Sequence, residues 1–352
     1  DITDFGLFYF FNVHDLVHDL ALYVAKEEYL MVDARTRNIP EQVRHISIVE
    51  NGLLDHAVFP ISRSLRTIIF PIEGVGLASE ILLKTWVSRY RYLRVLHLSD
   101  SSFETLPNSI AKLGHLRVLD LSSNRKIKRL SNSICKLQNL QVFSVSGCME
   151  LETLPKGIGM LMNLRELKIT TKQSSLSEDE FANLSNLQTL SFEYCDNLNF
   201  LLEKAQLSSL QILVVRSCGS LKSLPLHILP KLDALFVADC RMINLFLDDE
   251  SPNKRLRMKF LHVENFPGLR VLPEWIEGAA DTLQTLMIYN LPKLGFLPDC
   301  LPRMTHLKRL HVAECPSLLF LQSHIHCLTT LEDLSIDGCP AWDSLHGKSY
   351  FT

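Results

Sequence analysis

The pattern Leu-x-x-Leu-x-Leu, in which another apolar residue can replace a leucine, recurs along most of the chain and restricts its fold more than any other feature. A copy starts every 22 to 26 residues, at Leu93, Leu116, Leu140, Leu164, Leu187, Leu210, Leu232, Met258, Leu283, Leu307 and Leu331. Two weaker copies start at Val43 and Leu65, which brings the number to about 13. A length of 352 residues alone would suggest about two globular domains, but a period of this kind indicates an array of stacked units.

Each Leu-x-Leu places alternate side chains on one side of a short strand, and the rest of the repeat returns along the opposite face. One unit cannot bury its leucines alone, whereas parallel stacking of neighbours buries a continuous apolar column. The period is typical of leucine-rich repeat proteins. The sequence therefore predicts an α/β fold, a leucine-rich-repeat solenoid of about 13 repeats of 22–28 residues. The solenoid is expected to occupy residues 39–352, and a short helical remnant residues 1–38.

The cysteines follow the same period. Six of the nine stand at the ninth position of a repeat, where Asn or Cys serves backbone groups of the turn after the strand: Cys148, Cys195, Cys218, Cys240, Cys315 and Cys339. Neighbouring copies would lie about 5 Å apart, but their parallel side chains would be strained by a disulfide. We therefore expect reduced, packed thiols and a reducing compartment, the cytoplasm.

The segment before the repeats has apolar residues at helical spacing between residues 13 and 24. In such a helix His14 and His18 stand one turn apart, as a zinc site would require. The zinc-protease pattern needs Glu directly after the first His, however, and Asp15 stands there. No third ligand follows, so we expect no metal site.

The stretch at residues 11–21, Phe-Asn-Val-His-Asp-Leu-Val-His-Asp-Leu-Ala, resembles the Met-His-Asp motif of plant nucleotide-binding leucine-rich-repeat (NLR) immune receptors of the coiled-coil class. Residues 43–48 and 92–99 resemble the opening repeats of that family. The resemblance implies a C-terminal fragment of such a protein, with the end of its winged-helix region followed by its repeat domain. It further implies that His14 senses the phosphate of bound ADP and that Asp15 helps to hold the closed arrangement. A phosphate-binding G-x-x-x-x-G-K-[ST] is absent, so no cofactor is expected in this chain; ADP or ATP would bind in an upstream domain.

The resemblance implies the protein-recognition and autoinhibitory module of an intracellular plant immune receptor involved in disease resistance. Its partners would be a pathogen effector or a guarded host protein, and the nucleotide-binding domain within the full-length receptor. A cytosolic adaptor, such as the substrate-recognition arm of a ubiquitin ligase, is the alternative. A surface-receptor ectodomain is disfavoured because one glycosylation sequon occurs, at Asn183, and the Gly-x-Ile-Pro signature is absent.

Composition excludes several other classes. The net charge is −3 and no run of five like charges occurs, so nucleic acid is not expected as the main partner. The most apolar stretch near the start, residues 5–11, is too short for a membrane span. An enzyme would need a nucleophile and a base, such as Cys327 with His324 or His326, or Cys315 with His311. The repeat itself explains the proximity of His311 and Cys315, so we predict no catalytic activity.

Partner recognition is expected on the inner strands, where residues flanking the core leucines point to solvent and lie side by side across repeats. In the middle of the array these residues are unusually apolar and aromatic, with charges around them. The predicted protein-binding residues are Tyr194, Val214, Arg216, Phe236, His262, Met287, Tyr289 and Arg309. Such a composition is typical of interface hot spots, but the same residues can also simply pack against one another on a crowded sheet.

Overall fold

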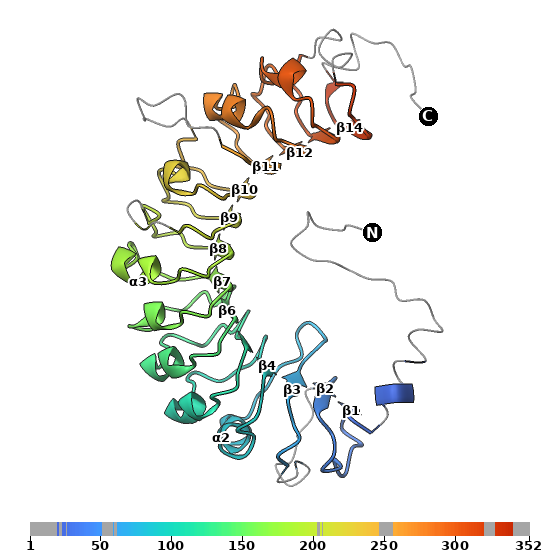
Figure 1. Cartoon of the computed structure of the whole chain (residues 1–352), viewed down its shortest axis with the longest axis vertical. Helices are drawn as coiled ribbons and strands as arrows, with labels where there is room; N and C mark the ends of the chain where they lie inside the picture. Colours follow the sequence, from blue (N-terminus) through green and yellow to red (C-terminus); the bar gives the residue numbers. More distant parts are fainter. Residues whose placement is uncertain are drawn as a thin grey trace.

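In the described part of the chain, short strands form one 14-stranded parallel sheet in which every strand pairs with its neighbours in sequence order, from β1 to β14. The computed structural model describes residues 27–50, 62–202, 207–245, 256–319 and 328–340, together with residues 20, 23–25, 59 and 205. The sheet lines the inner side of an arc, and short helices lie on its outer side (Figure 1). This arrangement is the predicted leucine-rich-repeat solenoid.

The strands are three to five residues long, as the short Leu-x-Leu pattern requires. They are β1 (Tyr29–Val32), β2 (His45–Ile48), β3 (Thr67–Ile69), β4 (Val95–His97), β5 (Val118–Asp120), β6 (Val142–Val145), β7 (Glu166–Ile169), β8 (Thr189–Glu193), β9 (Ile212–Arg216), β10 (Ala234–Ala238), β11 (Phe260–Glu264), β12 (Thr285–Tyr289), β13 (Arg309–Ala313) and β14 (Asp333–Asp337). Strand β5 shows the principle: Leu116, Leu119 and Leu121 are fully buried, while Asp120 between them stays partly exposed.

The outer segments are short helices rather than strands: α2 has 10 residues, and the others have three to six. They comprise α2 (Glu80–Arg89), η2 (Asn108–Lys112), η3 (Asn132–Lys136), η4 (Ile158–Met160), α3 (Glu178–Ala182), η5 (Leu226–Ile228), η6 (Glu274–Ala279) and η7 (Leu301–Arg303), where η denotes a 3-10 helix. Pro107 and Pro273 precede η2 and η6 in extended conformation. Proline lacks the N–H that a ladder needs, and its fixed φ suits the entry to a helical turn.

The sheet begins earlier than the sequence pattern does. Strand β1 pairs with β2 in register, Leu30 opposite Ile46 and Val32 opposite Ile48, upstream of the predicted boundary at residue 39. The predicted helix is only partly described: Leu20 and residues 23–25 are helical, and the remainder lies outside the described residues.

The turn position after β5, β6, β8, β9, β10, β13 and β14 holds a buried Asn or Cys side chain. The Nδ2 atom of Asn124 donates to the carbonyl oxygens of Leu98 and Leu121, at 2.8 and 2.6 Å. The thiol of Cys148 donates to the same Leu121 oxygen at 3.1 Å. All eight described cysteines are free and buried, which confirms that they are packing residues. Burial raises the pKa of the Cys148 thiol to about 12, so this sulfur stays protonated and unreactive.

Candidate functional site

The predicted recognition residues form a row on the inner sheet. Parallel pairing places Val214, Phe236, His262 and Met287 opposite one another on β9, β10, β11 and β12. Neighbouring strands in a sheet lie about 4.8 Å apart, so this register brings residues from four repeats into contact. The structure thus assembles the row that the period predicted.

Aromatic rings stack along this row. The Phe236 ring lies 4.6 Å from that of Phe260 and 6.0 Å from the imidazole of His262, measured between centroids. The His262 imidazole in turn stacks on Tyr289 at 5.5 Å. Such ring pairs each contribute about 0.5–1.5 kcal/mol beyond the area they bury. Stacking therefore holds these side chains in fixed positions.

The charged side chains of Glu264 and Arg216 lie beside the His262 ring of the stack. His262 Nε2 lies 3.0 Å from Glu264 Oε2, and Arg216 Nη2 lies 3.9 Å from the same carboxylate oxygen. Burial lowers the pKa of His262, although its hydrogen bond with Glu264 acts in the opposite direction. The imidazole is therefore neutral near pH 7.

Exposure divides the predicted residues into two groups. Val214, Phe236, His262 and Met287 are all less than 10% exposed, so they pack against one another and offer little area to a partner. Tyr194 is 43% exposed, and the Arg216 side chain is 49% exposed. Tyr289 is partly exposed as well, and we call these three accessible residues, which lie at the ends of β8, β9 and β12, the concave rim.

Arg309 lies beside the concave rim rather than in it. It is the first residue of β13, and its Nε donates to the Thr285 hydroxyl on β12 at 3.1 Å. The structure therefore holds this guanidinium against the sheet, one strand beyond Tyr289.

A polar groove of about 740 Å³ follows the strand ends next to the concave rim. Asn265 Nδ2 donates to Asp239 Oδ1 at 2.6 Å, and Asn290 Nδ2 donates to Asn265 Oδ1 at 2.7 Å. All three residues have positive φ, a conformation that Asn and Asp tolerate better than most residues. This ladder was not predicted, although an Asn or Asp stands directly after the inner strand in three successive repeats.

A second polar network, also missed, lies on the inner face of the amino-terminal repeats. His97 Nε2 lies 2.8 Å from Asp120 Oδ2, and the hydroxyl of Ser122 donates to Asp120 Oδ1. Ser122 also lies 2.7 Å from the Ser144 hydroxyl. Burial raises the pKa of Asp120, but hydrogen bonds from His97 and Ser122 outweigh it and leave the pKa below its usual value. The sequence signal was His97 and Asp120 at one register in adjacent repeats.

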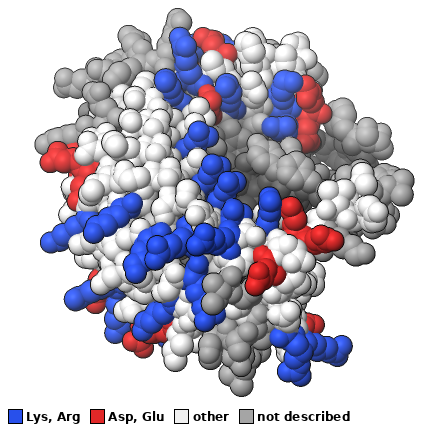
Figure 2. All heavy atoms as spheres, turned by 60° about the horizontal axis from the view of Figure 1, so that its bottom comes forward, with Lys and Arg blue, Asp and Glu red and all other residues white. Residues whose placement is uncertain are grey.

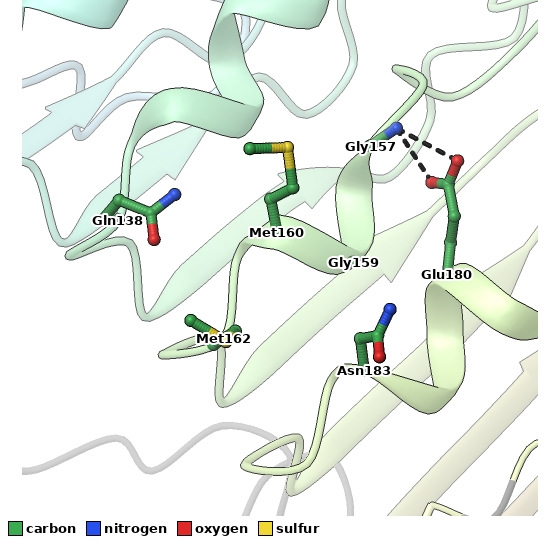
Figure 3. A pocket seen from close by; sticks show the side chains of 7 residues that line it. All are labelled: Gln138, Gly157, Gly159, Met160, Met162, Glu180 and Asn183. Atoms are coloured by element: carbon green, nitrogen blue, oxygen red, sulfur yellow. Dashed lines mark hydrogen bonds between the residues drawn. The ribbon is translucent and has the colours of Figure 1, made fainter.

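The outer face carries a pocket of about 360 Å³ between η3, η4 and α3 (Figure 3). Its side chains include the exposed Met160 and Met162. The Glu180 carboxylate accepts the N–H of Gly157 at 3.0 Å and that of Ile158 at 2.9 Å, so it caps η4. The acidic group in this pocket thus serves the fold, and the lining includes no histidine, cysteine or lysine.

Comparison with known proteins agrees with this architecture. A family model described as a leucine-rich repeat region matches residues 72–280. The chain belongs to this leucine-rich repeat family. Over 119 residues the leucine-rich repeat chain is 34% identical to RGA1 of Solanum bulbocastanum, which is named as a disease resistance protein. The matched stretch covers 34% of this chain and 10% of that relative. This similarity confirms the resemblance to plant disease resistance proteins.

Solved structures share the solenoid fold at low sequence identity. The TLR13 structure in complex with ssRNA13 aligns with a TM-score of 0.53 and 15% identity, over 88% of this chain and 56% of that one. An internalin from Listeria monocytogenes aligns with a TM-score of 0.50 and 14% identity, over 77% of this chain and 80% of that one. At these identities the similarity concerns the leucine-rich repeat fold alone.

The residues weighed for catalysis do not form a reactive pair where the structure describes them. His311 Nε2 lies 3.1 Å from Asp333 on the inner face, whereas the buried Cys315 thiol donates to the carbonyl oxygen of Ala313. His324, His326 and Cys327 lie outside the described residues, as do His14, Asp15 and His18. In the ranges that the leucine-rich repeat structure describes, no cluster of three potential metal ligands occurs. Every helix in those ranges is also too short or too polar to traverse a bilayer.

Proposed function

We propose that this leucine-rich repeat chain is the protein-recognition module of a plant immune receptor. The observation that carries the proposal is the concave rim, in which Tyr289 stacks on His262, Arg216 lies near Glu264, and Tyr194 is exposed after β8. Tyr and Arg, together with Trp, are the residue types enriched in interface hot spots. The similarity to RGA1 supports disease resistance as the process, with a pathogen effector or a guarded host protein as the partner.

The stack explains why such a rim is suited to binding. Ordering a side chain on association costs about 0.5–1.5 kcal/mol. Tyr289 is already packed on His262, and Arg216 already faces Glu264, so part of this cost is met in the free protein. A partner that offers an apolar surface with a carboxylate nearby would gain both aromatic contact and an ion pair with Arg216.

The proposal extends to the longer receptor. There the repeat domain would restrain the nucleotide-binding domain at rest, and His14 with Asp15 would report on bound ADP. A cytoplasmic location is part of the same proposal. The free, buried cysteines support it, because oxidising compartments favour disulfides.

The test is affinity capture from the source tissue, followed by calorimetry with the captured partner. Truncation of Tyr289 to Ala should weaken binding by about 2 kcal/mol, roughly thirtyfold, and Arg216→Ala by a similar factor. Phe296→Ala removes an aromatic ring that is 52% exposed outside the inner strands and serves as the matched control. Equal loss in the control and the two rim variants, with all three folded, would rule out the concave rim as the binding site.

A further inference from the structure

Residues 177–180, Ser-Glu-Asp-Glu, have the sequence of a helix capping box, Ser-x-x-Glu, but do not form one. In a capping box the serine hydroxyl accepts the N–H of the third helical residue, and the glutamate carboxylate accepts the N–H of the serine. Helix α3 begins directly after Ser177, yet the Ser177 side chain forms no capping hydrogen bond. The Glu180 carboxylate instead accepts the N–H groups of Ile158, at 2.9 Å, and of Gly157, at 3.0 Å (Figure 3), in the preceding repeat. The fold therefore leaves the Ser177 hydroxyl without its usual helical partner.

The Ser177 hydroxyl is accessible in the folded chain. Ser177 is exposed, and its backbone is extended, with φ −75° and ψ 107°. The five residues before it lie outside helices and strands. This segment is anchored on both sides of the serine: Gln173 Oε1 accepts the N–H of Leu154 at 2.8 Å, and the buried Phe181 follows in α3. An enzyme can thus reach the hydroxyl without unfolding of the solenoid.

The residues after Ser177 supply a distinctive charge pattern. Ser177 is the only serine or threonine of the chain that three consecutive acidic residues follow. Protein kinases discriminate between substrates by such charge patterns, and a kinase with a basic substrate groove would gain charge-assisted contacts from this run. By contrast, lysine and arginine side chains form a band over the face that Figure 2 shows. The acidic run is therefore a local signal in a chain whose net charge is only −3.

Thr330 provides a comparison within the same chain. It is exposed, and two acidic residues follow within three positions. Its hydroxyl, however, donates to the carbonyl oxygens of Thr305 and Leu307, at 3.0 and 2.9 Å. Transfer of a phosphoryl group to Thr330 would have to break these contacts, whereas Ser177 forms no capping bond that has to be broken. The structure thus distinguishes two hydroxyls that resemble each other in sequence.

We propose that Ser177 is a phosphorylation site for a protein kinase that selects serines followed by acidic residues. The Ser177 oxygen attacks the γ-phosphorus of ATP bound to the kinase, the bond from that phosphorus to the β,γ-bridging oxygen breaks, and ADP leaves while a base of the kinase takes the hydroxyl proton. The product carries an additional charge of about −1.5 to −2 beside Glu178 and Asp179. Because Glu180 rather than Ser177 caps η4, we expect the solenoid to stay folded after modification.

This site is separate from the concave rim, because α3 lies on the outer side of the arc (Figure 1), so the proposal does not depend on the proposed function. The direct test incubates the whole folded chain with ATP and an acidophilic serine/threonine kinase of the casein kinase class, and maps the phosphate by tandem mass spectrometry. Ser177→Ala should abolish incorporation. It should also unfold at an unchanged denaturant midpoint, since the cost of losing an N-cap serine comes from a hydrogen bond that is not formed here. The matched control is Ser175→Ala, which removes an exposed serine two positions away and should leave incorporation unchanged.

A second pair of variants tests the charge pattern. Glu178→Gln combined with Asp179→Asn should slow phosphorylation about tenfold, because two contacts to a basic groove are lost. Glu73→Gln combined with Asp281→Asn makes the same change in net charge at two exposed residues away from α3 and should leave the rate unchanged. The proposal is overturned if the folded chain takes up no phosphate, if the phosphate maps to Ser174 or Ser175, or if both charge variants slow the reaction equally. Phosphorylation that requires prior unfolding of the chain would overturn it as well.

Discussion

The variant Phe236→Ala tests whether this ring stabilises the inner sheet or contacts a partner directly. Its ring is only 7% exposed and stacks on Phe260 at 4.6 Å. Removal of a buried phenylalanine ring costs about 3–5 kcal/mol. The site opens onto the concave surface, where neighbours and water can partly fill the gap, so we expect a value near the lower end, about 3 kcal/mol. That corresponds to a factor of roughly 10² in the local unfolding equilibrium.

Hydrogen exchange measured by mass spectrometry suits this prediction, because each repeat contacts mainly its neighbours and the loss should stay local. Amides of β9, β10 and β11 should exchange faster in the variant, while those of β4 to β6 keep their protection. Phe296→Ala, which removes a ring that is 52% exposed, should change exchange by less than about 1 kcal/mol. If both variants behave alike, the packing role of Phe236 is refuted. If Phe236→Ala stays stable but loses the partner, the ring acts directly in recognition.

Three further predictions concern other parts of the solenoid. Gly159→Ala should lower stability by about 1–3 kcal/mol in denaturant titrations, because its new methyl carbon would clash with the Glu180 carbonyl oxygen; an unchanged midpoint would contradict this close contact. Cys218, whose pKa is raised to about 12 by its hydrogen bond with Cys195, should resist iodoacetamide until the protein unfolds, and rapid labelling of the native protein would show the thiol to be accessible. His262 has a lowered pKa in the folded state, so stability should fall as pH drops below about 6.5, its ordinary value, and His262→Gln should remove that part of the pH dependence.

The sequence period was sufficient to predict the strand register and therefore the membership of the concave row. Val214 and Phe236 lie opposite each other because both stand between the two buried residues of their strands. Exposure was not predictable in the same way, because it depends on the size of side chains one position away. Phe260, which lies outside the predicted set, covers Phe236, and Tyr289 covers His262. Half of the expected binding residues are consequently buried.

Strand β1 was not predicted from the sequence, because its repeat lacks one of the apolar residues of the pattern. Its Leu30 and Val32 occupy the places that Ile46 and Ile48 hold in β2. Three positions before Leu30, however, stands Glu27, where the next repeat has the buried Val43. Among the described strands β1 has a neighbour on one side only, so a polar residue costs less there than inside the array. A search for three apolar positions therefore passes over such a strand, although its backbone pairs as the others do.

Charge in a repeat protein has to be compared across repeats rather than along the chain. A net charge of −3 and the lack of like-charge runs suggested no strongly charged surface. The folded chain nevertheless aligns four arginines, from Arg44 to Arg117, that are separated by 22 to 28 residues in sequence. In the later repeats Asp233 and Lys259 occupy the same column and pair at 3.2 Å. Gln141 and Arg165 follow at the same position before β6 and β7, so arginine is common there in the first half of the array but is not a requirement of the scaffold, because both glutamine and an acid–base pair are compatible with it.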